Sequence, residues 1–550
     1  MKLALRILWG RLRCWIPFLV GAAVLIYGMS TTARLPTGDA PHILAISDKL
    51  AKMLGRGDFL EFFESWTSLV TPHPPAGYLF PTFFRLMGAS GSIPLLVGLS
   101  GLAMSWHGMI LLTRRVDEGS WGPWLGWLLM LSTAATWLAI EQMYWDMLAA
   151  GCVAASVGHL HASDGLRNSG HAICFGLFMG LGFVTKYTFP AFLLLPVMFA
   201  GVAILRFRSF GGLLISICGF LLVAGPWLFT YGDSVWAYVA QSSTPSMSIS
   251  DSPASSWTYR FTAENLLYYP TVLRDMLGWP GLVLVGIAFT RGWGTYGGRW
   301  AAWGALSGLL VLTFAGENQS RYLLPALPLM GALVDVGIRP GLGRAVSRFG
   351  MVVGLSVTLP ALWGAWSFVK ASDAAPASRD QTHAVESFLG WGAWPWPAEP
   401  FRPVSNPMKE WDVDEAIVAI SEVTGTGAHQ IGLLLPRDVR LPPASTYAWR
   451  AGNRGLEWDV ATIVSQGPGG RPMIFVGPLK PMGHRISRRF KVAYAVHGKG
   501  QFPSILRELA AKRVWSHDLH SGMQGSVFTV PDAGWGTPTG LEIQKDPIDG

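Results

Sequence analysis

The chain has 550 residues, of which half are hydrophobic and only 14% are charged. An ordinary soluble protein carries about 25% charged residues, so this composition excludes a wholly soluble globular protein and indicates that much of the chain faces lipid. The net charge of +8 is spread out without a dense basic tract, which argues against nucleic acid as a partner. The four cysteines lie in apolar segments, so we expect neither a disulfide framework nor a cysteine metal site.

The first apolar run extends from Cys14 to Met29 and follows a basic N-terminal segment. A cleaved signal peptide and a retained membrane helix both fit this pattern. The retained helix is favoured because many further apolar segments of membrane-spanning length follow. These lie at about 93–113, 121–140, 143–161, 170–185, 188–205, 210–230, 272–290, 299–316, 321–338 and 350–369. The sequence therefore predicts about eleven spans.

Basic residues in alternate loops predict how these spans are oriented. Cytoplasmic loops of membrane proteins are enriched in Lys and Arg. With a cytoplasmic N-terminus, every inward loop of this chain is basic, the residues being Arg114, Arg115, Arg167, Arg206, Arg208, Arg291, Arg299, Arg339, Arg344 and Arg348. An odd number of spans then places the C-terminal region outside the cytoplasm, which in a Gram-negative cell is the periplasm.

Two long outward loops are expected at 30–92 and at about 231–271. In the first, HILAISDKLAKML (residues 42–54) has apolar residues at helical spacing, which predicts a helix lying in the membrane interface. The second is rich in Ser, Pro and Tyr, which is typical of a flap over a site.

The pattern changes after residue 370, so we predict a transmembrane domain over 1–370 and an extracytoplasmic domain over 371–550. Short apolar runs of strand length alternate with helical patterns in the second domain, which favours a small α/β fold. The expected helices are WDVDEAIVAISEVTG (411–425) and FPSILRELAAKR (502–513), and the expected strands are QIGLLLP (430–436), RPMIFVGP (471–478) and KVAYAVH (491–497).

Polar residues gather at the predicted outward ends of the spans. They are Asp39, His42, His73, Glu141, Asp146, Lys186, Glu317, Asn318 and Arg321. Polar groups at membrane depth are costly and usually face a cavity or a partner. Because they share one side, they indicate a site at the outer surface, whereas a transporter more often places such groups near the bilayer midplane.

Lys186 and Arg321 are the most informative of these residues, because short outward turns tend to lack basic residues. Each is either a snorkelling side chain at a helix end or part of a clamp for phosphate. Asp39 fits a helix N-cap or a catalytic carboxylate. His73, which precedes two prolines, fits a turn or a catalyst, and Asp146 fits a buried ion pair or catalysis.

Several stretches together resemble the integral-membrane glycosyltransferases that use polyprenyl-phosphate sugars, a group that includes protein O-mannosyltransferases and lipid A aminoarabinose transferases. The stretches are GDAPH (38–42), HPPAGYLFPTFFRLMG (73–88), YWDMLAA (144–150), GLGFVTKYTFPAFLLLP (180–196) and QSRYLLPALPLMGAL (319–333). Their order, spacing and sidedness match together over about residues 10–370.

This resemblance implies a GT-C fold, which is a mainly α multi-span bundle with interfacial helices in the first outward loop and a soluble outward domain. It implies Asp39 as the general base, and Lys186 and Arg321 as ligands of the donor phosphate. Residues expected near the substrates are His42, His73, Glu141, Asp146 and Tyr322. The implied reaction is an inverting transfer from a lipid-linked donor to a lipid, glycan or protein acceptor in the plasma membrane.

One position departs from the family pattern, in which the first-loop Asp is commonly followed by Glu. Here Asp39 is followed by Ala40. A non-catalytic assembly protein or a transporter of lipid-linked sugars is therefore the alternative to an enzyme. No ligand set in the sequence argues for a catalytic metal, and no cofactor is expected.

Overall fold

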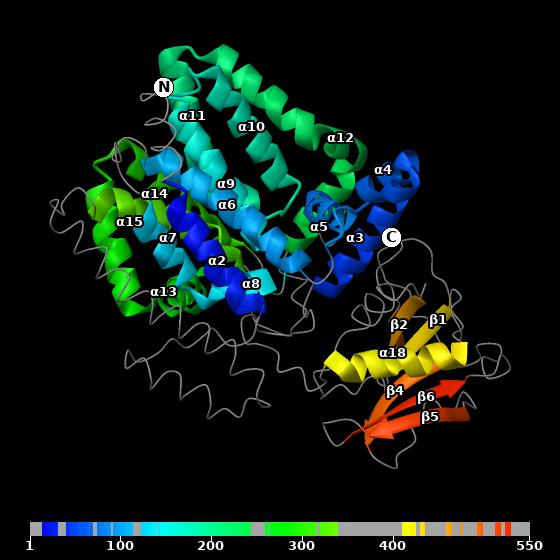
Figure 1. Ribbon diagram of the computed structural model, residues 1–550. Coiled ribbons are helices and arrows are strands. Elements are labelled where there is room, and N and C mark those ends of the chain that lie inside the picture. Colours follow the sequence, from blue (N-terminus) through cyan, green and yellow to red (C-terminus); the bar gives the residue numbers. More distant parts are fainter. Residues whose placement is uncertain are drawn as a thin grey trace, which may run out of the picture. The chain divides into compact units, whose positions relative to one another are not determined.

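A computed structural model shows a mainly helical chain with one six-stranded β-sheet (Figure 1). The structure describes residues 14–30, 40–69, 74–89, 92–113, 123–141, 143–243, 259–261, 263–315, 320–338, 410–424, 429–434, 458–464, 473–475, 492–498, 512–518 and 523–529. They fall into two compact units. The first is helical, and the second contains the sheet together with residues 33–52.

The helical elements follow most of the predicted spans. The α-helices are α2 (Ile16–Ser30), α3 (Ala40–Arg56), α4 (Phe59–Thr67), α5 (Ala76–Leu86), α6 (Ile93–Thr113), α7 (Trp124–Leu131), α8 (Ala134–Glu141), α9 (Asp146–Ala162), α10 (Ser169–Phe183), α11 (Leu194–Phe207), α12 (Phe210–Ser243), α13 (Ala263–Gly292), α14 (Tyr296–Phe314) and α15 (Ala326–Ile338). The described part of the chain also contains the short 3₁₀ helices η1 (Phe189–Phe192), η4 (Tyr259–Phe261) and η5 (Ser320–Leu323). The predicted span 350–369 lies outside the described residues.

The prediction of one continuous helix over 121–140 is wrong, because α7 ends at Leu131 and α8 begins at Ala134. Side chains donate hydrogen bonds to the last carbonyl groups of α7 at this break. The Thr133 and Thr136 hydroxyls donate to the Met130 carbonyl at 2.8 and 2.9 Å, and the Trp137 indole donates to the Leu131 carbonyl at 2.8 Å. Such local bonds compete with the helical ladder, and an apolar run does not reveal them.

Helices α6 and α9 form the closest pair in the bundle and run side by side in Figure 1. Glycines make this approach possible. Gly101 and Gly108 of α6 face the backbone of α9, and Gly151 and Gly158 of α9 face the backbone around Gly101 and Gly108 in return. A Cβ atom at any of the four would overlap the other helix. Small residues at this spacing are the usual means of close helix packing in membranes.

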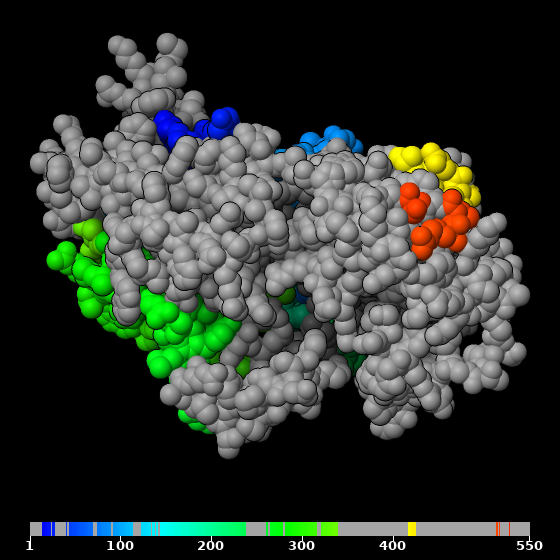
Figure 2. Space-filling view, turned by 90° about the horizontal axis from the view of Figure 1, so that it is seen from below, coloured from blue at the N-terminus to red at the C-terminus, as the bar shows by residue number. Residues whose placement is uncertain are grey.

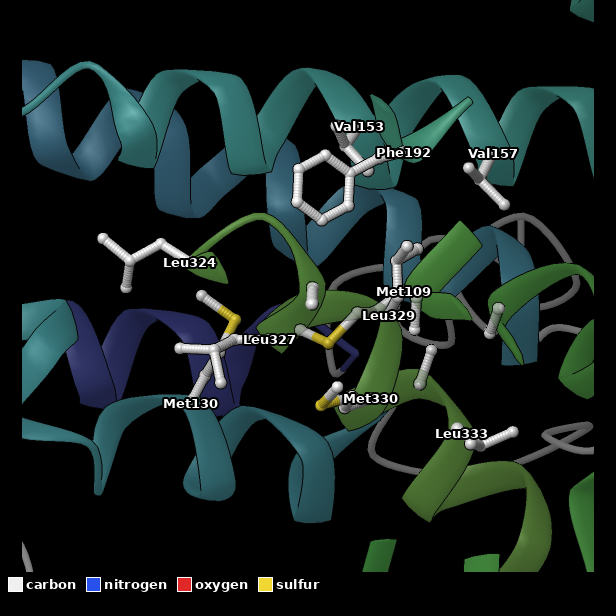
Figure 3. Close-up of a cluster of buried hydrophobic side chains, with 14 of the residues drawn as sticks. Met109, Met130, Val153, Val157, Phe192, Leu324, Leu327, Leu329, Met330 and Leu333 are labelled. Carbon is white, nitrogen blue, oxygen red and sulfur yellow. The ribbon is translucent and has the colours of Figure 1, made fainter. Parts of the chain in front are cut away.

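Helix α15 lies at the centre of the apolar core, and its side chains from Ala326 to Gly337 are buried. Figure 3 shows Leu329 and Met330 of α15 in the same buried cluster as Met109 of α6 and Val153 of α9. This packing fixes η5, which precedes α15 in the chain, against the ends of the neighbouring helices.

The helix predicted over 42–54 is present as α3, and its apolar residues Ile43, Leu44 and Leu50 are buried. The following helices α4 and α5 carry exposed apolar side chains, which include Phe59, Leu60, Phe63, Phe83 and Leu86. The placement of α3 in the membrane interface stays a prediction.

Helix α13 is bent at Gly278, whose φ of 63° and ψ of 167° favour glycine. The helix also carries exposed apolar side chains on either side of the bend, and Figure 2 shows its green atoms at the surface on one face. These side chains are Leu266, Leu267, Val283 and Ile287.

Two described helical segments are long and apolar enough to cross a membrane by length and composition, Ile93–Thr113 and Phe210–Ala237. Shorter apolar helices of 10 to 17 residues accompany them, at Ile16–Tyr27, Ser169–Phe183, Leu194–Phe207, Gly281–Gly292 and Ala326–Ile338.

The second unit contains helix α18 (Glu410–Thr424) and a mixed sheet with the strand order β3-β2-β1-β4-β6-β5. The strands are β1 (His429–Leu434), β2 (Trp458–Val464), β3 (Met473–Phe475), β4 (Val492–Gly498), β5 (Lys512–Asp518) and β6 (Met523–Thr529). Strands β2, β1 and β4 are parallel, and β3, β6 and β5 pair antiparallel at the two sides. Helix α18 packs on β4 and β6 and buries Ala416, Ile417 and Ile420.

The helix predicted over 502–513 is wrong at its end, because Lys512 and Arg513 begin β5. Antiparallel pairing with β6 provides backbone hydrogen bonds that outweigh the helical preference of these residues. Residues 502–511 lie outside the described part of the chain. The predicted domain boundary at 370–371 also lies outside it and stays a prediction.

The close contact of α6 and α9 predicts that even one methyl group is harmful at Gly108. Gly108→Ala places a Cβ against the Ala154 carbonyl group, and overpacking of this kind costs about 1–3 kcal/mol. We expect a lower midpoint of thermal unfolding in detergent than for the wild type.

Gly286→Ala in α13 is the matched control, because nothing lies within 4 Å of its added Cβ. Alanine favours a helix over glycine by about 1 kcal/mol, so this variant should unfold at the wild-type temperature or slightly above it. Equal midpoints for the two variants would contradict the packing described for α6 and α9.

Candidate functional site

An ion pair joins the beginning of α9 to the end of α10. Asp146 is the first residue of α9, and Lys186 lies three residues beyond the end of α10. The Lys186 ammonium group donates a hydrogen bond to Oδ2 of Asp146. The Asp146 side chain is fully buried and the Lys186 side chain is 12% exposed. A carboxylate in the first turn of a helix also interacts favourably with the helix dipole.

The turn after α10 positions Lys186. The backbone amides of Thr185 and Lys186 both donate to the Gly182 carbonyl at 3.1 Å, and the Thr185 hydroxyl donates to the Leu181 carbonyl at 2.6 Å. The Lys186 carbonyl accepts a hydrogen bond from the Phe189 amide, which starts η1. The side chain therefore projects from a tightly bonded turn.

Arg321 and Tyr322 of η5 complete the cluster with Tyr144. The Lys186 nitrogen lies 4.9 Å from the centre of the Tyr322 ring, and the Arg321 guanidinium carbon lies 6.0 Å from the same centre. The guanidinium group also lies 4.5 Å from the centre of the Tyr144 ring. The Tyr322 ring therefore connects the two cations through cation–π contacts.

The beginning of α5 is anchored beside this cluster. The Ala76 amide donates to the Val184 carbonyl at 2.8 Å, and the Tyr78 ring packs edge-on against Trp145 with 4.6 Å between ring centres. Gly77 faces the Trp145 ring so closely that a Cβ would overlap it. The segment HPPAGY is thereby tied to the ends of α9 and α10 at Ala76–Tyr78.

The residues named from the sequence fall into two groups. The structure brings Asp146, Lys186, Arg321 and Tyr322 together at one end of the bundle. The other six lie outside the description wholly or in their side chains. Asp39, His73, Glu317 and Asn318 lie outside the described residues, and only the helical backbone is described for His42 in α3 and Glu141 in α8.

Sequence reasoning did not name Tyr144 as a site residue. Its signal was the aromatic pair Tyr144–Trp145 immediately before the acid in YWD. Aromatic residues are common at membrane interfaces, so the pair does not stand out without the position of Arg321. Among the described residues, no group of three or more His, Cys, Asp or Glu side chains has the arrangement of a metal site.

Positive charge exceeds negative charge among the three ionised side chains of the cluster. Asp146 contributes one negative charge, and Lys186 and Arg321 contribute two positive charges. These three side chains therefore carry a net charge of +1. Lys186, Arg321 and Tyr322 are half-buried, so the two charges lie in surroundings of lower dielectric constant than water, where charges interact more strongly.

The ion pair predicts non-additive effects on stability. Removal of one partner of a buried pair costs about 3–5 kcal/mol, because the remaining charge loses its counter-charge. We expect Asp146→Ala and Lys186→Met each to lower the thermal midpoint in detergent strongly. The double variant should unfold closer to the wild type than the sum of the two effects.

The exposed pair Asp164–Arg167 is the matched control for this cycle. Its atoms are 3.5 Å apart and its side chains are 52% and 58% exposed. Exposed pairs contribute about 0–1 kcal/mol, so the effects of Asp164→Ala and Arg167→Ala should be nearly additive in the double variant. Additive effects in the Asp146–Lys186 cycle would contradict a coupled buried pair.

No protein-family model and no curated protein matches the sequence. Solved structures of ArnT from Cupriavidus metallidurans do match the fold. The apo structure gives a TM-score of 0.50 at 14% identity, and the match covers 94% of this chain and 97% of that chain. The structure bound to undecaprenyl phosphate gives a TM-score of 0.52 at 14% identity, covering 94% and 98%.

ArnT is a lipid A aminoarabinose transferase of the GT-C type, which is one of the groups that the sequence stretches resemble. The likeness extends over nearly the whole of both chains. The resemblance expected from the sequence is therefore confirmed at the level of the fold, and this chain has the GT-C-like fold of ArnT.

Proposed function

We propose that this protein transfers a glycosyl group from a polyprenyl-phosphate-linked sugar to an acceptor at the extracytoplasmic face of the membrane. The observation that carries the proposal is the convergence of Lys186 and Arg321 on the Tyr322 ring. This pair of cations occurs in a chain whose fold is that of ArnT, which has been solved with undecaprenyl phosphate bound.

The charges of the cluster suit a phosphate ester. A glycosyl ester of a polyprenyl phosphate is a phosphodiester with one negative charge, which matches the net charge of Asp146, Lys186 and Arg321. The guanidinium group of Arg321 is suited to bidentate binding of phosphate, and Lys186 acts as a point charge. Asp146 holds Lys186 in place and offsets part of its charge.

The leaving group explains why two cations are useful. The bond between the anomeric carbon and the phosphate oxygen breaks as the acceptor oxygen attacks from the opposite side, and its electron pair stays on the phosphate. The lipid phosphate therefore gains negative charge during the reaction. Preplaced cations stabilise that developing charge more than they stabilise the donor, and this difference lowers the barrier.

The attacking hydroxyl group must lose a proton, and we assign this role to Asp39. A carboxylate positioned as general base contributes about 10²–10⁴ in rate. Helix α3 begins at Ala40. In the sequence, Asp39 directly precedes this residue, which is the N-cap position. A base on the face opposite the phosphate gives inversion at the anomeric carbon in a single displacement.

The remaining assignments complete this proposal. His42, His73, Glu141 and Tyr322 are assigned to substrate binding, and the acceptor is a lipid, glycan or protein hydroxyl. The chain crosses the plasma membrane about eleven times, with its N-terminus in the cytoplasm and its C-terminal α/β domain outside. No cofactor is assigned to the reaction.

A transfer assay tests the proposal. Purified protein in lipid nanodiscs is supplied with synthetic polyprenyl-phosphate sugars and a membrane extract as acceptor, and release of polyprenyl phosphate is measured. We expect Asp39→Asn to lower the rate about 10²–10⁴-fold. Arg321→Ala should lower it by a similar factor, because charge stabilisation of the leaving group is lost.

Arg299→Ala is the control, because Arg299 is an exposed arginine in the first turn of α14 and should be dispensable. Full activity of both Asp39→Asn and Arg321→Ala would contradict the assigned site. Binding of the donor without any transfer would favour the alternative function, a non-catalytic or transport protein for lipid-linked sugars, for which Ala40 beside Asp39 is the sequence observation.

A further inference from the structure

Three histidines form a continuous chain of imidazole rings away from the Asp146–Lys186 pair. His107 of α6 and His159 of α9 approach through their Nε2 atoms at 3.2 Å. His159 and His171 of α10 approach through their Nδ1 atoms at 3.0 Å. The ring centres are 5.2 Å apart in both pairs. The central ring is 6% exposed, so it lies inside the bundle.

The three histidines link three different helices. His159 is 13 residues beyond Asp146 on α9, which corresponds to about 20 Å along the helix. The ion pair therefore connects α9 to the end of α10, and the histidines connect α9 to the beginning of α10 and to α6. We call His107, His159 and His171 the histidine triad.

The geometry of the triad suits hydrogen bonds between the rings and not coordination of one metal ion. His159 uses Nε2 toward one neighbour and Nδ1 toward the other, so one ion cannot reach nitrogens of all three rings in this arrangement. Neutral rings complete both hydrogen bonds when His171 donates its Nδ1–H to His159 and His159 donates its Nε2–H to His107. One further proton also fits, because a doubly protonated central ring donates one N–H to each neighbour.

The Phe178 ring of α10 fits this arrangement, because it stacks on the His159 ring with 5.5 Å between centres and 17° between planes. A cationic ring over an aromatic face gains a further favourable contact. A second added proton on the triad has no favourable position of this kind. It would turn one outer ring from an acceptor into a donor, so that two N–H groups would face each other between two adjacent cations.

Other titratable groups on the packed elements do not replace this arrangement. Among the described residues at the same end of these elements, Asp164 pairs with Arg167 at the surface, and His161 lies against Tyr296 of α14. Asp335 of α15 accepts a hydrogen bond from the Gly126 amide, and Arg299 of α14 is exposed. The ring contacts of His107 and His159 described above are made within the triad and with Phe178.

We propose that the histidine triad is an acid-sensitive clasp that holds α6, α9 and α10 together with at most one proton. The unfolded chain binds up to three protons at these residues below the ordinary histidine pKa of about 6.5. Because the unfolded state then binds more protons than the folded state, the clasp loses its stabilising effect as the pH falls. An excess of two protons changes the unfolding equilibrium about 100-fold per pH unit.

Thermal unfolding in detergent between pH 8.0 and pH 5.0, followed by tryptophan fluorescence, tests the clasp. The wild type should lose on the order of 5 °C more than His159→Phe over this range. His161→Phe is the matched control, because His161 is a buried histidine of α9 outside the triad. It should lose at most the share of one histidine in the pH dependence, because a single residue differs by at most one proton between the folded and unfolded states.

His171→Leu removes only the outer bond from α10 and provides a second variant if His159→Phe does not fold. It should also flatten the pH profile. Coincident profiles of the wild type and the triad variants would overturn the proposal, as would loss of the pH dependence in His161→Phe. A rise in the wild-type midpoint on addition of Zn²⁺ at pH 7.5, absent in His159→Phe, would identify a metal site instead.

Discussion

The buried ion pair of Asp146 and Lys186 is the interaction on which the proposed site depends. Burial of two charges is costly, and a pair of this kind persists only where the geometry is good. Here the glycine contacts of α6 and α9 fix the helix that carries Asp146, and the bonded turn after α10 fixes Lys186. The aromatic ring of Tyr322 then places Arg321 beside this pair.

The arrangement separates structural and chemical roles within a few ångströms. Asp146 is fully buried and forms an ion pair with Lys186, whereas Lys186 and Arg321 are only half-buried. The Lys186 nitrogen lies 4.9 Å and the Arg321 guanidinium carbon 6.0 Å from the centre of the Tyr322 ring, so both cations interact favourably with its electron-rich face. In the proposed reaction, the donor phosphate meets cations whose positions are already fixed, so little reorganisation opposes binding or the charge that develops on the phosphate.

Four residues named from the sequence lie together in the structure, whereas the roles assigned to them stay predictions. Alternating basic loops assigned Lys186 and Arg321 to one side of the membrane, and the structure brings them to one ring. For Asp146 the sequence left two interpretations open, an ion pair and a catalytic role. The structure shows an ion pair with Lys186. The break after α7 was missed because hydropathy does not register threonine bonds to carbonyl groups. The histidine triad was missed because its members are 52 and 12 residues apart.

The central claim is that Lys186 and Arg321 bind the phosphate of a polyprenyl lipid. Native mass spectrometry of the purified protein with undecaprenyl phosphate or undecaprenol measures this directly. The account predicts that the wild type binds the phosphate form at least about tenfold more tightly than Arg321→Ala does, which corresponds to about 1.4 kcal/mol. Undecaprenol should bind both proteins equally. Equal affinity of the two proteins for undecaprenyl phosphate would contradict the claim.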